Sequence, residues 1–189
     1  MDSADQGVPQ QGGHRRRRFL ASLGVLAIAG VAKPARATPS ERGPRELRFE
    51  HTHTGEKLRV CYFDGRAYEP EALATIDRYL RDFRTGETCA IDVALLDQLF
   101  QVHRLTEAAT AFQVISGYRS PKTNRQLRAD GHGVASNSMH LLGRAIDIRL
   151  PGVELTQLRE AARSMLAGGV GYYAASDFVH LDTGRVRYW

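Results

Sequence analysis

The chain has too few cysteines to build a cysteine-rich metal cluster or a disulfide framework. Cys61 and Cys89 are the two cysteines among its 189 residues. In an exported protein these two could pair with each other, and they could equally be two separate buried thiols. A structural zinc site of four cysteines is therefore excluded, and a metal site would have to rely on histidine and carboxylate side chains.

The sequence also lacks a long hydrophobic run and, beyond its first residues, an excess of charge. The apolar segment 19–32 is shorter than the roughly 20 residues that a membrane-spanning helix needs. Residues 1–37 hold six basic and two acidic side chains, so most of the net charge of +5 lies there and about +1 remains for the rest. A nearly neutral body has no electrostatic signature of nucleic-acid binding.

Residues 1–37 show the order of features typical of an export signal. The arginines at 15–18 precede the apolar segment, and Ala-Arg-Ala at 35–37 supplies the small-x-small pattern of a cleavage site. The arginine pair before Phe19 and Leu20 resembles a twin-arginine export signal. We predict cleavage after Ala37 and a periplasmic protein with no stable membrane insertion. The alternatives are a basic tail or a single anchor helix.

After a linker at 38–45, the hydrophobic pattern predicts one α+β domain over residues 46–189. Period-two alternation predicts strands, and apolar residues three and four apart predict helices. The strands are expected as a hairpin within 47–62 and at 112–115, 145–148, 170–173, 178–182 and 186–189, and the helices at 70–84, 92–105, 121–129 and 155–167. We expect an antiparallel sheet with the helices packed on one side. His51 and His53 lie near the hairpin turn, and we expect both to be exposed polar turn residues.

Two short stretches carry the residues with the clearest chemistry, 136–147 and 177–182. His140 stands in a turn that Gly143 would allow, whereas Asp147 and His180 fall in predicted strands. Two imidazoles and a carboxylate suit a divalent transition metal, and a catalytic zinc site needs three protein ligands with one position left for water. Each residue alone is better explained as a polar residue of a core or strand end. Their combined spacing favours a metal site.

Three spaced motifs then resemble a known group of enzymes. They are Ser-Gly-Tyr-Arg-Ser at 116–120, Ser-x-His-x-x-Gly-x-Ala-x-Asp at 138–147 and Asp-x-x-His at 177–180. They resemble the zinc peptidases grouped with D-Ala-D-Ala peptidases, lysostaphin and hedgehog, which are related to peptidase family M15. The chain is most similar to the twin-arginine-exported murein endopeptidase branch, once classed as a domain of unknown function. The resemblance covers about 47 to 189.

That resemblance implies one zinc ion per chain, bound by His140, Asp147 and His180, with a metal-bound water as the nucleophile. A carboxylate is still needed to accept the proton of the water. Asp177 stands where many relatives have glutamate and is the preferred base. Asp182 is its rival, either as the base, as the partner that orients His180, or as a further ligand.

Three other residues of the same region are candidates, Arg119 as a second catalytic residue and Ser138 and His132 as secondary ones. Arg119 resembles the family arginine that stabilises a developing oxyanion or holds a substrate carboxylate, and outside the motif it would read as a helix-start arginine. Ser138 could hydrogen-bond beside the ligand loop or could be a simple turn serine. His132 lies in a glycine-bounded loop, where it could line a substrate cleft or have no catalytic part.

Together these observations predict a zinc-dependent endopeptidase that hydrolyses the peptide cross-links of peptidoglycan. The similar branch implies D-Ala–diaminopimelate or diaminopimelate–diaminopimelate bonds as substrates. One alternative is a carboxypeptidase that trims stem peptides. Another is a non-catalytic zinc-containing module that binds the wall. The residues leave the oligomeric state open.

Overall fold

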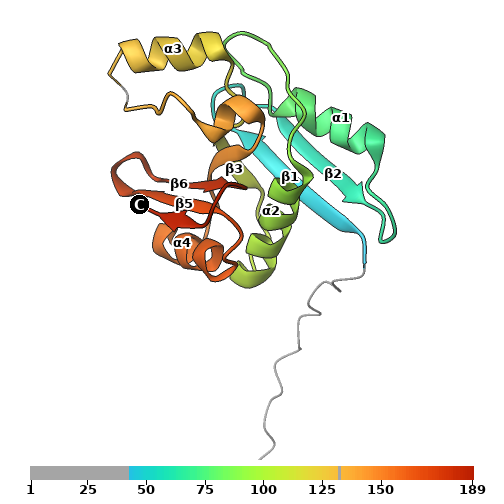
Figure 1. The fold of residues 1–189 in the computed structure, drawn as a ribbon. Coiled ribbons are helices and arrows are strands. Elements are labelled where there is room, and N and C mark those ends of the chain that lie inside the picture. Colours follow the sequence, from blue (N-terminus) through green and yellow to red (C-terminus); the bar gives the residue numbers. More distant parts are fainter. Residues whose placement is uncertain (1–42, 132) are drawn as a thin grey trace, which may run out of the picture. The chain divides into compact units, whose positions relative to one another are not determined.

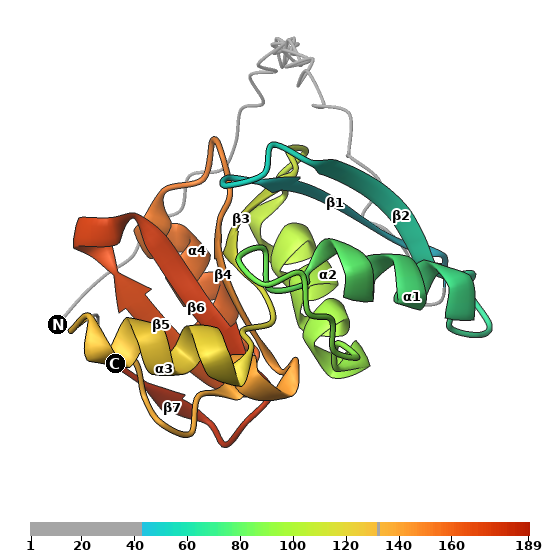
Figure 2. The same cartoon turned by 90° about the horizontal axis from the view of Figure 1, so that it is seen from above.

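The computed structural model describes residues 43–131 and 133–189, within the compact unit Ala37–Trp189. The predicted signal segment 1–37, residues 38–42 of the linker and His132 lie outside the described residues. Seven strands form a sheet in the order β2-β1-β3-β4-β6-β5-β7 (Figures 1 and 2). The strands are β1 Arg45–His51, β2 Lys57–Phe63, β3 Phe112–Ser116, β4 Ala145–Arg149, β5 Gly169–Tyr173, β6 Phe178–Asp182 and β7 Arg187–Tyr188. The helices are α1 Pro70–Tyr79, α2 Val93–Thr106, α3 Pro121–Ala129, α4 Leu155–Ser164, and the short 3₁₀ helices η1 Met139–Leu142 and η2 Ala174–Ser176.

The sheet is mixed, so the prediction of a purely antiparallel sheet was wrong. Strand β1 pairs antiparallel with β2 but parallel with β3, and β5 pairs parallel with β7. A parallel pair needs a crossover connection, usually helical, because the chain must return to the starting edge. Helices α1 and α2 lie between β2 and β3 in the chain and supply that connection. The central pairs β3–β4 and β4–β6, which carry the candidate site, are antiparallel as expected.

Three of the four α-helices share one hydrophobic core with the sheet. This core contains Ile76 of α1, Leu99 of α2 and Leu158 of α4, together with Ile146 and Ile148 of β4. Burying each such side chain stabilises the fold by about 1.5–3 kcal/mol. Helix α3 is the exception, because α3 and α4 lie on opposite sides of β5 and β6 in both views (Figures 1 and 2). The prediction of helices on one side is therefore correct for α1, α2 and α4 and wrong for α3.

Helix α1 ends five residues before its predicted end because the chain turns sharply around Asp82. The Asp82 carbonyl accepts hydrogen bonds from the amides of Thr85 and Gly86, and its own amide donates to Glu87. Asp82 is 1% exposed, and its carboxylate accepts hydrogen bonds from the Arg84 amide of this turn and from the Ser120 amide before α3. A buried carboxylate with such partners holds the loop 80–87 in place.

Two further expectations concern histidine and cysteine. His51 is 1% exposed, so the expectation of an exposed turn residue was wrong for it and correct for its neighbour His53. The His51 ring packs edge-on against Phe83. Cys61 and Cys89 are both free thiols, one exposed and one half-buried. None of the helices in the described ranges is long and apolar enough to cross a membrane.

Candidate metal centre

Two neighbouring strands and one turn bring His140, Asp147 and His180 together. Asp147 in β4 lies directly opposite His180 in β6 in the antiparallel ladder. Alternation along β4 sends Ile146 and Ile148 into the core, so Asp147 projects from the other face of the sheet. All three side chains are buried, with residue exposures between 3% and 8%.

The turn that carries His140 is fixed at both ends. The Ser138 side chain caps η1 by accepting a hydrogen bond from the His140 amide at 3.4 Å. Gly143 ends η1 with a φ of +65°, a conformation that other residues rarely adopt. A Cβ at this glycine would also collide with the Ala90 carbonyl oxygen. Both the backbone conformation and the lack of space for a side chain therefore require glycine at this end of the turn that carries His140.

The ligand atoms of the three residues converge within 4.8 Å of one another. His180 Nδ1 lies 2.8 Å from Asp147 Oδ1 and 3.2 Å from His140 Nε2. His140 Nε2 lies 3.3 Å from Asp147 Oδ2. In a tetrahedral site with ligands about 2.0–2.1 Å from zinc, two ligand atoms stand about 3.3 Å apart. The donor set and its spacing therefore fit a zinc-sized ion.

The remaining ring nitrogen of each imidazole is held by an oxygen acceptor. His140 Nδ1 lies 2.7 Å from the Gly117 carbonyl, and His180 Nε2 lies 3.0 Å from Asp182 Oδ2. When these outer nitrogens donate their protons, the inner nitrogens of both rings present lone pairs to the centre. Hydrogen bonding of the outer nitrogen is how proteins fix the tautomer of a metal-binding histidine.

The charges of the group are strongly coupled. Burial by itself raises the pKa of Asp147, but the neighbouring His140 and His180 overcome this and hold the pKa of that carboxyl below its ordinary value. Burial lowers the pKa of His180, but Asp147 and Asp182 overcome it and hold the pKa of that ring above its ordinary value. The shift of Asp147 favours an ionised carboxylate at neutral pH, which is the form that binds a cation. The shift of His180 favours the protonated ring, so a bound cation would have to displace the proton from Nδ1.

Arg119 follows the turn after β3 and lies beside this group. Its guanidinium is 3.9 Å from Asp147 Oδ2, and its side chain is only 11% exposed. Burial lowers the pKa of Arg119, although Asp147 opposes the shift. The Arg119 Nε is buried without a hydrogen-bond partner in the described part of the chain.

The two candidate bases lie in different environments. Asp182 is completely buried, and its carboxylate accepts hydrogen bonds from His180, from the Gly169 and Gly184 amides and twice from Arg187. Burial raises the pKa of Asp182, but His180 and Arg187 overcome it and hold that pKa below its ordinary value.

Asp177 follows η2 in a left-handed conformation and is 60% exposed at its side chain. It forms an ion pair with Arg149, which lies two residues after Asp147 on the same face of β4.

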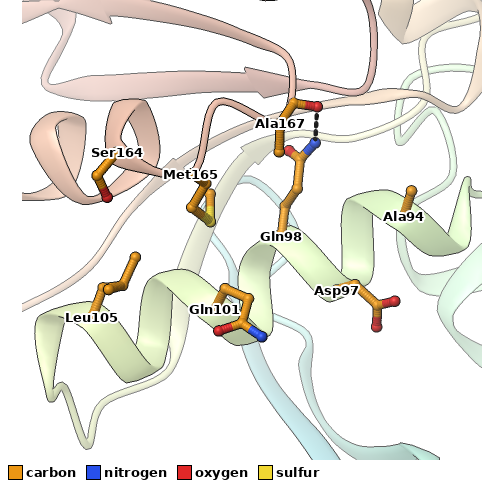
Figure 3. Close-up of a pocket in the computed structure, with 8 residues that line it drawn as sticks. All are labelled: Ala94, Asp97, Gln98, Gln101, Leu105, Ser164, Met165 and Ala167. Atoms are coloured by element: carbon orange, nitrogen blue, oxygen red, sulfur yellow. Dashed lines mark hydrogen bonds between the residues drawn. The ribbon is translucent and has the colours of Figure 1, made fainter. Parts of the chain in front are cut away.

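A groove of about 540 Å³ lies elsewhere, between α2 and α4 (Figure 3). Gln98 crosses it to donate a hydrogen bond to the Ala167 carbonyl at 3.0 Å. Its one carboxylate, Asp97, is already bound by Arg45 and Tyr62. The groove belongs to the helical side of the sheet and lacks the chemistry of the group at His140.

Comparison with known proteins agrees with the motifs. The family described as peptidoglycan L,D-endopeptidase MepK matches residues 39–189. The chain belongs to this family. The MepK peptidoglycan L,D-endopeptidases of Escherichia coli K12 and Shigella flexneri are each 46% identical to it over 175 residues, or 92% of this chain and 96% of theirs. The probable MepK enzyme of Haemophilus influenzae is 37% identical over 176 residues, or 92% and 95%.

Some structural partners of the site in this family member were not anticipated from its sequence. Trp189 packs beside the His180 ring, with ring centroids 5.3 Å apart, and its indole donates to the Tyr173 hydroxyl at 2.8 Å. A Cβ at Gly171 would collide with this indole. Gly171 in the Gly-Tyr-Tyr run at 171–173 could have indicated this contact, because glycine within a strand often marks the close approach of another group.

Proposed function

We propose that this protein is a zinc-dependent endopeptidase that hydrolyses peptide cross-links of peptidoglycan in the periplasm. The observation that carries the proposal is the convergence of His140 Nε2, an Asp147 oxygen and His180 Nδ1, with both outer imidazole nitrogens bound by acceptors. Membership of the peptidoglycan L,D-endopeptidase family supports the substrate class.

His140, Asp147 and His180 would hold the ion, since two neutral imidazoles and one carboxylate form a typical catalytic zinc set. Bound zinc would supply polarisation of the scissile carbonyl and a water that ionises near neutral pH. Asp182 would act as the positioning residue of His180 and not as the base, because each of its oxygens already accepts hydrogen bonds. Arg119, whose guanidinium lies 3.9 Å from Asp147 Oδ2, would bind the developing oxyanion or a substrate carboxylate.

Asp177 remains our proposed general base. It is exposed, it precedes His180 by three residues, and its partner Arg149 holds it over the face of β4 from which Asp147 projects. Release of the Arg149 ion pair on substrate binding would free the carboxylate to accept a proton and to return it to the leaving amine.

The proposed bond joins two diaminopimelate residues. "L,D" in the names of the relatives suggests a bond from an L-centre carbonyl to a D-centre amine, and a diaminopimelate–diaminopimelate cross-link has that configuration. We further propose that residues 1–37 are a twin-arginine export signal. Transport in the folded state would let the protein acquire its metal before export.

Digestion of purified, cross-linked muropeptide dimers tests this function. The wild-type protein is expected to convert dimers to monomers, whereas His180→Ala and a chelator-treated sample should leave the dimers intact. Product masses identify the bond, and linear stem peptides in parallel report any carboxypeptidase activity. Intact dimers after incubation with zinc-loaded wild-type protein would contradict the proposal.

A further inference from the structure

A buried carboxylate ties the backbone of a second arginine, Arg84, to the turn that carries Arg119. Asp82 Oδ1 accepts a hydrogen bond from the Arg84 amide at 3.0 Å, and Oδ2 accepts one from the Ser120 amide at 2.9 Å. One carboxylate thus ties the loop after α1 to the turn that carries Arg119. A second tie is the hydrogen bond from the Tyr118 amide to the Leu80 carbonyl at 2.8 Å.

The Arg84 side chain is positioned by an aromatic ring. Its guanidinium carbon lies over the Phe83 ring, 4.2 Å from the centroid, and the same ring stacks on His53 at 4.4 Å. Such a cation–π contact orients a guanidinium while its N–H groups stay free to bind an acceptor. Arg84 is also exposed, so a ligand can reach it.

The positive charges of Arg84 and Arg119 are not fully neutralised by carboxylates of the described residues. Burial is the main cause that lowers the pKa of Arg119, and the charge of Arg84 adds to it. Within residues 43–131 and 133–189, no carboxylate forms an ion pair with Arg84, and the Arg119 Nε has no acceptor. Asp82 offsets part of this charge, but its oxygens are taken up by backbone amides. Two cations on backbone segments that one carboxylate ties together, one of them exposed and without a carboxylate partner, are suited to an anionic group.

We infer that Arg84 and Arg119 together bind a free carboxylate of the substrate, and that Arg84 is a specificity-determining residue. This inference rests on the proposed function. In a cross-link to the D-centre amine of diaminopimelate, the carbon that bears the leaving amine also bears an unreacted carboxylate. That carboxylate is one carbon removed from the scissile nitrogen. An arginine 3.9 Å from the ligand Asp147 is suited to bind it.

The test compares two synthetic dimers that differ only at this group, one with the free carboxylate and one with a carboxamide. Wild type, Arg84→Ala, Arg84→Lys and the control Arg81→Ala are assayed with both. Arg81 belongs to the same loop, but it pairs with Glu56 on the hairpin turn. Loss of a charge-assisted hydrogen bond predicts a KM about 10- to 100-fold higher for Arg84→Ala on the carboxylate dimer, with little change in kcat. Arg84→Lys should recover part of this loss, because lysine keeps the charge but not the planar fork.

The amidated dimer decides the interpretation. The KM of the wild type should be about 10- to 100-fold higher for the amidated dimer than for the carboxylate dimer. Arg84→Ala should have similar KM values for the two dimers. An equal effect of Arg84→Ala on both dimers, or none on either, would overturn the inference.

Calorimetric binding of a ketomethylene analogue, in which CO–CH₂ replaces the scissile amide, gives a readout independent of turnover. If the wild type cleaves neither dimer, the proposed function fails, and carboxylate-dependent binding that is weakened in Arg84→Ala still decides the role of Arg84.

Discussion

Replacing Asp182 with asparagine should cost the protein most of its metal affinity, although Asp182 is not among the three proposed ligands. The carboxylate accepts five hydrogen bonds in the structure. An asparagine side chain has one amide nitrogen, which must face a donor in either orientation. When it faces His180 Nε2, that nitrogen becomes the acceptor and the ring proton moves to Nδ1, the atom that should bind the metal.

The size of the effect follows from the role of such outer partners. Loss of the acceptor behind a metal-binding histidine lowers metal affinity about 10- to 100-fold, which corresponds to about 1.4–2.8 kcal/mol. The folded state should lose about 2 kcal/mol as well, because Arg187 loses a charged acceptor. The assay is competition for zinc against a chromophoric chelator, accompanied by urea unfolding of the metal-free protein.

Asp92→Asn is the matched control. The Asp92 carboxylate also accepts hydrogen bonds from an arginine, Arg144, and from the Thr183 hydroxyl, but it contacts neither His140 nor His180. The Asp92→Asn substitution should lower the free energy of unfolding with little effect on zinc affinity. Equal zinc affinities for Asp182→Asn and the wild type, or an equal loss in both variants, would refute the assignment of Asp182 as a positioning residue.

Three further outcomes are expected. Asp177→Asn should lower kcat about 100-fold or more with unchanged zinc content, as measured by dimer turnover and metal analysis; full activity would exclude Asp177 as the base. Gly143→Ala should weaken zinc binding and lower the unfolding midpoint, because the left-handed backbone and the Ala90 carbonyl both oppose a Cβ; a wild-type midpoint and affinity would contradict this. Burial lowers the pKa of His103 in the folded protein below its ordinary value of 6.5. The neutral ring therefore contributes to the free energy of unfolding above pH 6.5, and this contribution is lost as the pH falls through the folded-state pKa. His103→Gln should therefore lose less stability than the wild type between pH 8 and pH 5 in urea titrations, and an identical loss would count against it.

The local pattern of the chain predicted the elements well but not their partners. Alternation at 145–148 and 178–182 located β4 and β6, and the spacing of His140, Asp147 and His180 identified the residues that the structure brings together. The parallel pairing of β1 with β3 depends on contacts between segments about 60 residues apart, for which periodicity carries no information. Helix α3 was placed wrongly for the same reason, since its position relative to the sheet is a tertiary property.

The supporting residues of the site were harder to predict. Asp182 had three open roles in the sequence, and only its burial and its bond to His180 favour the positioning role. The buried carboxylate of Asp82 ties Arg84 to the turn of Arg119, and the sequence could not show this tie because its second partner, the Ser120 amide, lies 38 residues away. His51 was expected at the surface because it lies next to a turn, yet aromatic side chains from α1 and the loop after it bury it.

The measurement that tests the central claim most directly is zinc-edge X-ray absorption with metal analysis of the purified protein. The account predicts one zinc per chain with two imidazole nitrogens and a carboxylate oxygen among its ligands. His180→Ala and Asp147→Asn should each lose that stoichiometric zinc or change its ligand set. A wild-type protein that takes up no zinc, or variants that keep the wild-type spectrum and stoichiometry, would contradict the assignment of these residues as the metal centre.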